Sequence, residues 1–130
     1  MSLNIDPARW GKHLWKSLHY MAHAFPEQPS EQDKQAAMQL MQSLAYLLPC
    51  AKCREHYAAY LAEAPPNVES REAFARYLNQ LHNKVNARLD KEQVPYDPTV
   101  AYGKPSTNWL QITIAIVIGI AIGYLLCKRL

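Results

Sequence analysis

The chain has 130 residues, enough for one domain with a modest core, and its 49% hydrophobic content excludes a disordered chain. The net charge of +3 is too small, and the basic residues too scattered, to favour nucleic-acid binding. Three cysteines are too few, and odd in number, for a structural disulfide framework. The first residues contain no apolar stretch, so we expect no secretory signal peptide.

Apolar residues recur with a helical period through most of the chain, and four helices are expected. The first begins with Asp6 as N-cap and Pro7 in its first turn, and Pro26 ends it. Ser30 and Asp33 have the spacing of a capping pair and begin the second helix. The expected core stripes of these two helices are Trp10, Leu14, Leu18, Met21, Ala22 and Phe25, and Ala37, Leu40, Met41, Leu44 and Leu48.

Pro49 separates the second helix from a third, Pro65 and Pro66 end the third, and Ser70 begins a fourth. No strand-like alternation appears, so the predicted fold class is all-α, and the short loops favour an antiparallel four-helix bundle. The stripes of the last two helices are Cys50, Cys53, Tyr57, Tyr60 and Leu61, and Phe74, Tyr77, Leu78, Leu81, Val85 and Leu89.

Residues 109–127 form an uncharged apolar run, which as a helix is about 28 Å long and matches the hydrocarbon core of a bilayer. Trp109 and Tyr124 lie near its ends, as interfacial aromatics do. A buried core helix is the alternative, but the length favours a single-pass transmembrane anchor. The preceding segment is rich in proline, so we expect a domain at 1–95 and a linker at 96–108.

The position of this apolar run predicts insertion after synthesis, with the catalytic domain on the cytosolic side. Lys128 and Arg129 outnumber Lys104 across the run, and that charge difference alone favours the opposite orientation. The cytosolic orientation is preferred because the domain carries no signal that would translocate it.

Cys50 and Cys53 form a Cys-x-x-Cys motif that directly follows a proline. At the start of a helix, free N–H groups and the helix dipole stabilise a thiolate and permit reversible disulfide formation. Zinc binding is the alternative, because His56 completes a ligand-like spacing. A second close Cys/His pair is missing, since His82 stands alone and Cys127 lies in the apolar run. Redox chemistry is therefore favoured, and no metal site is expected.

The expected fourth helix carries three polar side chains, His82, Asn83 and Asn86, on or beside one face. Burying an imidazole and two amides is costly unless each finds a hydrogen-bond partner. A planar ligand with polar edges would satisfy them, and a solvated polar face would explain them equally well. The pattern alone leaves both interpretations open.

The expected first helix contains Trp10, Gly11, Trp15 and His19. A glycine inside a helix costs about 1 kcal/mol relative to alanine, so Gly11 suggests the close approach of another group. The aromatic residues are typical of a core, and they would equally line a slot for a flat cofactor.

Taken in order along the chain, these motifs resemble the Erv/ALR family of sulfhydryl oxidases over residues 9 to about 96. The resemblance implies a four-helix bundle that holds FAD, with a short extra helix, usually as a homodimer. The chain has no additional shuttle cysteine pair, and with His56 it is more similar to the minimal enzymes of large DNA viruses. A viral origin would place the anchor in a virion or host membrane. The motifs are Trp10-Gly11-x3-Trp15-x2-Leu18-His19-x2-Ala22, Pro49-Cys50-x2-Cys53 and Leu81-His82-Asn83-x-Val85-Asn86-x2-Leu89-x-Lys91.

The resemblance implies that a thiol-containing protein or thiol oxidoreductase is the partner, and that two thiols and O2 give a disulfide and H2O2. Cys50 would be the outer, attacked sulfur and Cys53 the thiol beside the flavin. A zinc-stabilised membrane adaptor and a flavin-free membrane thiol reductase are the alternatives, and a yellow protein would distinguish the oxidase from both. The FAD contacts implied are Arg9, Trp10, Gly11, Trp15, His19, Cys53, His56, Tyr77, His82, Asn83, Val85, Asn86, Lys91 and Tyr96.

Overall fold

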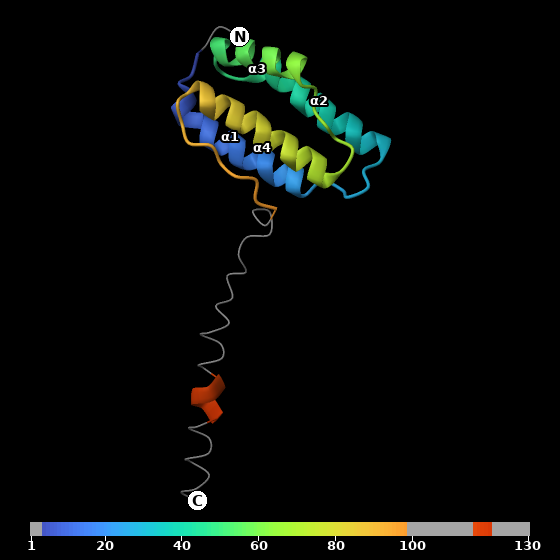
Figure 1. Ribbon diagram of the computed structural model, residues 1–130, viewed down its shortest axis with the longest axis vertical. Coiled ribbons are helices and arrows are strands. Elements are labelled where there is room, and N and C mark those ends of the chain that lie inside the picture. Colours follow the sequence, from blue (N-terminus) through green and yellow to red (C-terminus); the bar gives the residue numbers. More distant parts are fainter. Residues whose placement is uncertain (1–3, 99–115, 121–130) are drawn as a thin grey trace, which may run out of the picture.

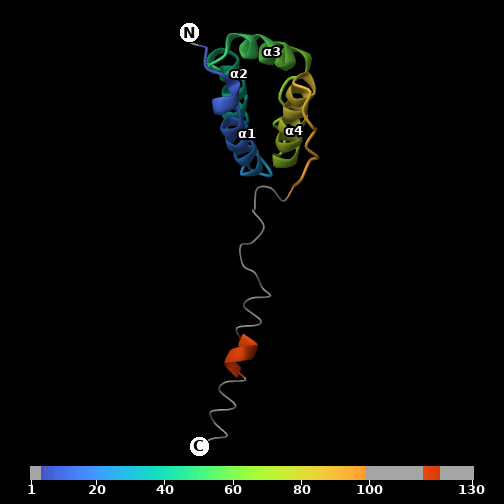
Figure 2. The same cartoon turned by 90° about the vertical axis from the view of Figure 1, so that its left-hand side faces the viewer.

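A computed structural model describes residues 4–98 and 116–120 (Figure 1). Residues 4–98 contain four helices and no strand, which confirms the all-α prediction for this part of the chain. Helix α1 packs against α4 and α2 packs against α3, and the views in Figures 1 and 2 show how the two pairs are arranged. The helices are α1 (Pro7–His23), α2 (Glu31–Leu47), α3 (Ala51–Glu63) and α4 (Arg71–Arg88).

The helix starts follow from capping residues that the sequence identifies. The Asp6 carboxylate accepts a hydrogen bond from the Ala8 N–H at 2.9 Å, and Pro7 lies in the first turn of α1. Ser30 and Asp33 form the expected capping box of α2, and the Ser70 hydroxyl oxygen accepts from the Ala73 N–H at the start of α4. These caps satisfy N–H groups that lack partners within the helix, which is why the helices begin there.

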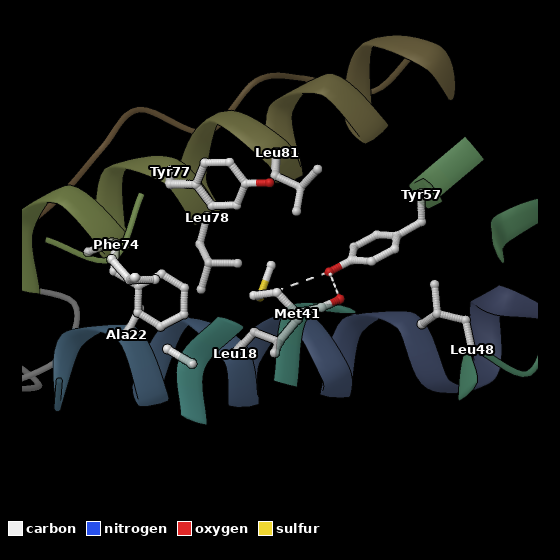
Figure 3. Close-up of a cluster of buried hydrophobic side chains, with 12 residues drawn as sticks. Leu18, Ala22, Met41, Leu48, Tyr57, Phe74, Tyr77, Leu78 and Leu81 are labelled. Atoms are coloured by element: carbon white, nitrogen blue, oxygen red, sulfur yellow. Dashed lines mark hydrogen bonds between the residues drawn. The ribbon is translucent and has the colours of Figure 1, made fainter. Parts of the chain in front are cut away.

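The core lies between the helix pairs, and Figure 3 shows side chains from all four elements meeting there. Phe74 and Leu78 from α4 and Met41 from α2 are fully buried. The Tyr57 hydroxyl of α3 donates to the Met41 carbonyl oxygen at 2.8 Å and so joins α3 to α2 inside this core. Burial raises the pKa of this hydroxyl well above its usual value, so it remains protonated and a donor.

Two residues of the expected core stripes are exposed, and for these the prediction was wrong. Met21 is 50% exposed, because the face of α1 that packs inward follows Leu18 and Ala22, and Met21 lies at its edge. Leu89 is 47% exposed, because it is the C-cap of α4, where the chain leaves the helix.

After α4 the chain turns back along the same helix as a segment that we call the strap (residues 90–97). Asp90 has a φ of 53°, in the left-handed region that Asp tolerates better than most residues. The Asp90 N–H donates to the Ala87 carbonyl and the Lys91 N–H donates to the Asn86 carbonyl at 2.9 Å. This pair of bonds is the Schellman pattern, which ends α4 and reverses the chain.

The expected transmembrane segment at 109–127 lies outside the described residues, except for 116–120, which are helical. Among the residues that the structure describes, no helix is both long enough and apolar enough to cross a bilayer. The expected linker at 96–108 and Cys127 also lie mainly or wholly outside the described residues.

Candidate functional site

Cys50 and Cys53 are joined by a disulfide at the start of α3, with their Cα atoms 5.1 Å apart. Cys50 is the N-cap residue rather than part of the helix, and its Sγ accepts a hydrogen bond from the Cys53 N–H at 3.2 Å. Both residues are partly exposed, so a solvent thiol can approach them. The helix start therefore supplies a backbone N–H donor to sulfur, as the motif predicts.

An aromatic cluster lies between α1 and α4. The Trp15 and His82 rings are stacked, with their centroids 4.1 Å apart and an interplanar angle of 8°. His19 Nε2 and His82 Nδ1 are 3.1 Å apart and share a hydrogen bond, in which one nitrogen donates and the other accepts. The structure thus brings together three of the residues that the sequence analysis singled out.

Both imidazoles in this cluster are held neutral near pH 7. Burial, then the neighbouring His19 and Lys91, lower the pKa of His82 to about 4. Burial and His23 lower the pKa of His19. Neutral imidazoles each offer one donor and one acceptor nitrogen, and their planar faces can stack, so this cluster suits a flat ligand with polar edges.

The amides of α4 are paired with the strap. Asn83 donates to the Val94 carbonyl at 2.8 Å and accepts from the Val94 N–H, also at 2.8 Å. Asn86 is 8% exposed and donates to the Glu92 carbonyl at 3.2 Å, while Asn79 donates to the Val94 carbonyl at 3.0 Å. These side chains have backbone partners in the strap, and the sequence pattern did not identify those partners.

The far end of the strap packs through Tyr96. Its ring stacks with His23, with centroids 6.3 Å apart, and the Arg76 guanidinium lies 4.3 Å from the ring centroid. His23 is only 7% exposed and is therefore buried. Burial lowers the pKa of His23, although Asp97 acts in the opposite direction. Sequence periodicity missed this contact because the partner of His23 comes from outside the helices.

The other candidate residues lie in varied surroundings. The Trp10 indole donates to the Ile5 carbonyl at 3.1 Å, and a Cβ added to Gly11 would meet no atom within 4 Å. The Tyr77 hydroxyl donates to the Ala64 carbonyl at 2.9 Å and is buried, which raises its pKa to about 12. His56 and Val85 are partly buried, and Arg9 and Lys91 are exposed.

The described residues offer no group of three His, Cys, Asp or Glu side chains that could hold a metal ion, so the zinc interpretation gains no support from them. Two cavities lie away from the aromatic cluster. One of about 400 Å³ is lined by Arg76 and Tyr77 among others, and one of about 670 Å³ lies between α2 and residues 66–69.

Comparison with known proteins gives one family. Residues 12–109 match the model of the Erv1 / Alr family. The chain is 30% identical to the "Putative FAD-linked sulfhydryl oxidase 096R" of Invertebrate iridescent virus 3, over 92% of this chain and 93% of that protein. It is 36% identical to the "Mitochondrial FAD-linked sulfhydryl oxidase ERV1" of Saccharomyces cerevisiae, over 66% of this chain but 46% of that protein. The chain thus spans nearly all of the viral relative and about half of the yeast one.

The fold agrees with a solved structure. The crystal structure of the FAD-binding domain of Erv1 from Saccharomyces cerevisiae superposes with a TM-score of 0.73 at 31% identity. The match covers 77% of this chain and 98% of that domain.

Proposed function

The chain belongs to the Erv1/Alr family, and we propose from this premise that it is an FAD-dependent sulfhydryl oxidase, which makes disulfides in a thiol-containing partner protein with O2 as electron acceptor and H2O2 as product. The observation that carries the proposal is the Cys50–Cys53 disulfide at the start of α3, within a helical fold of this family. It is joined by the aromatic cluster of α1 and α4, whose residue types suit a flavin.

The residues present fit FAD. Trp15 and His82 offer a stacked aromatic wall. His19 Nε2 and His82 Nδ1 bond each other, so the other ring nitrogens, His19 Nδ1 and His82 Nε2, would make the hydrogen bonds to FAD. Gly11 leaves the surface of α1 open to close approach by a ligand, because no protein atom occupies the position of its missing Cβ. When bound, FAD accepts two electrons from a dithiol and passes them to O2. We propose that the FAD contacts are the residues that the family resemblance implies. Among these, Asn83 and Asn86 also hold the strap, and Tyr96 belongs to it.

The chain's own residues carry out the thiol exchange. A partner thiolate forms a bond with Cys50 Sγ, the Cys50–Cys53 bond breaks, and Cys53 leaves as a thiolate. A second partner thiolate then attacks the partner sulfur of the mixed disulfide, so that the partner leaves with its own disulfide and Cys50 becomes a thiolate. The backbone N–H of Cys53 and the dipole of α3 stabilise negative charge on sulfur at this position.

The test is spectroscopic and then kinetic. The purified full-length protein should be yellow with an oxidised-flavin spectrum, and should consume O2 when a small dithiol is added. Cys50→Ser and Cys53→Ser should each abolish O2 consumption while retaining FAD, and Cys127→Ser is the control that should retain activity. A colourless protein with stoichiometric zinc would support the adaptor instead, and full activity in either active-site variant would refute the mechanism.

We further propose that residues 109–127 anchor the protein in a membrane, after a domain at 1–95 and a linker at 96–108. The composition of the segment supports this, as do the large apolar side chains Ile116, Val117, Ile118 and Ile120, which are all more than half exposed. Because its cysteines are catalytic, the domain needs no oxidising compartment to fold, and we place it on the cytosolic side of the membrane. If the protein is viral, that membrane would belong to the virion or the host. Protease treatment of intact membranes should digest the domain, and its protection until detergent is added would refute this orientation.

A homodimer is also proposed. Tyr20 and Met21 on α1 and Tyr46 and Leu47 on α2 are large apolar side chains that are 47–78% exposed, and such side chains favour association. Light scattering on the protein lacking residues 109–130 should give twice the chain mass, and Met21→Glu with Leu47→Glu should give the monomer mass. A monomer in the unsubstituted domain would refute the proposal.

A further inference from the structure

The segment that precedes α1 holds the start of α3. Asn4 Oδ1 accepts a hydrogen bond from the Ala51 N–H at 2.8 Å, and the Ile5 N–H donates to the Pro49 carbonyl oxygen at 2.7 Å. The two bonds lie on either side of Cys50 in the sequence. Asn4 and Ala51 are 47 positions apart, so this contact depends on the tertiary fold and not on the loop that joins α2 to α3.

The same segment is fixed to α1. The Trp10 indole donates to the Ile5 carbonyl oxygen, and Asp6, the next residue, is the N-cap of α1. Asn4 and Ile5 therefore form a bracket between the helix that carries the aromatic cluster and the helix that carries the disulfide. We call these two residues the N-terminal bracket.

The chemistry of the disulfide depends on a rigid first turn of α3. Its first N–H groups have no partner within the helix, and the Cys53 N–H is directed at Cys50 Sγ. The Ala51 N–H is held by Asn4, so the Cys53 N–H is the donor that stabilises negative charge on Cys50 when this sulfur becomes a thiolate. Helix ends fray unless other contacts hold them, and a frayed first turn would no longer direct its donors at the sulfur.

We propose that Asn4 and Ile5 are positioning residues of the oxidase reaction, which hold the first turn of α3 so that the Cys53 N–H stays directed at Cys50 Sγ, and so stabilises Cys50 when this sulfur is released as a thiolate from the mixed disulfide. This inference rests on the proposed function, because it concerns thiol exchange at Cys50. Removal of the Asn4 acceptor is expected to slow the release of Cys50 as a thiolate, and with it the opening of the disulfide to two free thiols, by about three- to tenfold, the range for losing one cap-type hydrogen bond.

The experiment compares full-length, FAD-loaded protein with three variants. Asn4→Ala removes the acceptor, and Asn4→Asp retains an acceptor oxygen in the same place. The matched control is Asn67→Ala, because Asn67 Oδ1 accepts from the Glu69 N–H at 3.2 Å in the loop before α4, away from the disulfide. The probe is reduced glutathione without O2, and the cysteine thiols that appear with time are alkylated and counted by mass. Amide hydrogen exchange over residues 50–54 reports the first turn directly, and FAD content reports the fold.

Asn4→Ala should open the disulfide three- to tenfold more slowly and exchange its amides at 51–53 faster, with FAD content unchanged. Asn4→Asp should open it within about twofold of the wild-type rate in 0.5 M salt, which screens the added charge, and Asn67→Ala should match wild type. A wild-type opening rate in Asn4→Ala, or equal slowing in Asn4→Asp and Asn4→Ala, overturns the inference.

If Asn4→Ala does not fold, Asn4→Asp alone decides. In Asn4→Asp, amide exchange at the wild-type rate together with disulfide opening within twofold of the wild-type rate supports the positioning role of the bracket. Slowing of disulfide opening by more than threefold refutes that role. Failure of the proposed function looks different, because the wild-type protein would then lack FAD or its disulfide would not exchange with thiols.

Discussion

Acidification should destabilise this protein through His82, and the size of the effect can be worked out from its surroundings. The pKa of His82 is lowered to about 4 in the folded state, against 6.5 in an unfolded chain, first by burial and then by His19 and Lys91. Between these two values the unfolded chain binds a proton at His82 that the folded chain does not. Stability is therefore complete above pH 6.5 and falls as the pH drops through the window from 6.5 to about 4.

At 1.36 kcal/mol per pH unit, the whole window corresponds to about 3.4 kcal/mol. The ring is only half-buried, so water screens the effect, and we expect about 1–2 kcal/mol. For a domain of this size that amounts to a fall of about 5–10 °C in the melting temperature. His82→Gln retains one donor and one acceptor but cannot titrate in this range.

The assay is urea unfolding at a series of pH values from 7 to 4, with FAD in excess. The comparison rests on how stability changes with pH and not on its absolute value, because His82→Gln also affects FAD binding. Wild type should lose about 1–2 kcal/mol more than His82→Gln across the window. His13→Gln, at an exposed histidine of the same helix α1 as His19, is the control and should follow wild type. Equal loss in wild type and His82→Gln would refute the reasoning.

Three further predictions concern single side chains. Gly11→Ala should stabilise FAD-free protein by about 0.5–1 kcal/mol in urea unfolding, because the added Cβ would meet no protein atom within 4 Å. The same substitution should weaken FAD binding in a flavin titration, and an unchanged FAD affinity would exclude contact at this position. Asn83→Ala should speed hydrogen exchange over residues 92–96 and lower the free energy of unfolding by about 1 kcal/mol. Both effects should be larger than those of Asn79→Ala, which removes one hydrogen bond to Val94 instead of two, and equal effects would contradict this. Tyr57→Phe should lower the free energy of unfolding by about 1 kcal/mol and leave FAD content unchanged, because it removes only the bond to Met41 in the core; a loss of FAD would contradict this.

Local signals in the sequence predicted much of the fold. The starts of α1, α2 and α4 lie at Asp6, Ser30 and Ser70, because a capping side chain acts on N–H groups two or three residues away. The redox pair could be predicted equally well, because the motif and the preceding proline place both sulfurs at the start of one helix. In each of these cases the interacting groups are close in sequence.

The parts that sequence reasoning missed depend on contacts between distant segments. His23 is buried because Tyr96 stacks on it from the strap. Asn83 and Asn86 gave a visible signal, a polar stripe that continues back to Asn79, but the pattern did not identify the strap as a partner of these side chains. Nothing near Asn4 in the sequence indicates Ala51 as its partner. Helical periodicity describes only contacts within the helices, so irregular segments that pack on them escape it.

The Cys50–Cys53 disulfide and the aromatic cluster lie on different helix pairs, and we expect this to determine which substitutions affect catalysis. The disulfide belongs to the pair α2 and α3, and the Trp15–His82 stack belongs to the pair α1 and α4. No single helix fixes the distance between them, so their alignment depends on the contacts that cross from one pair to the other. The shared core around Met41 and Leu78 supplies one such contact, and the N-terminal bracket supplies another at the disulfide itself. Core substitutions should therefore change stability and thiol oxidation together, because they move both pairs. A substitution in the bracket acts at one end only, and this is why its effect on the disulfide can be separated from its effect on the fold.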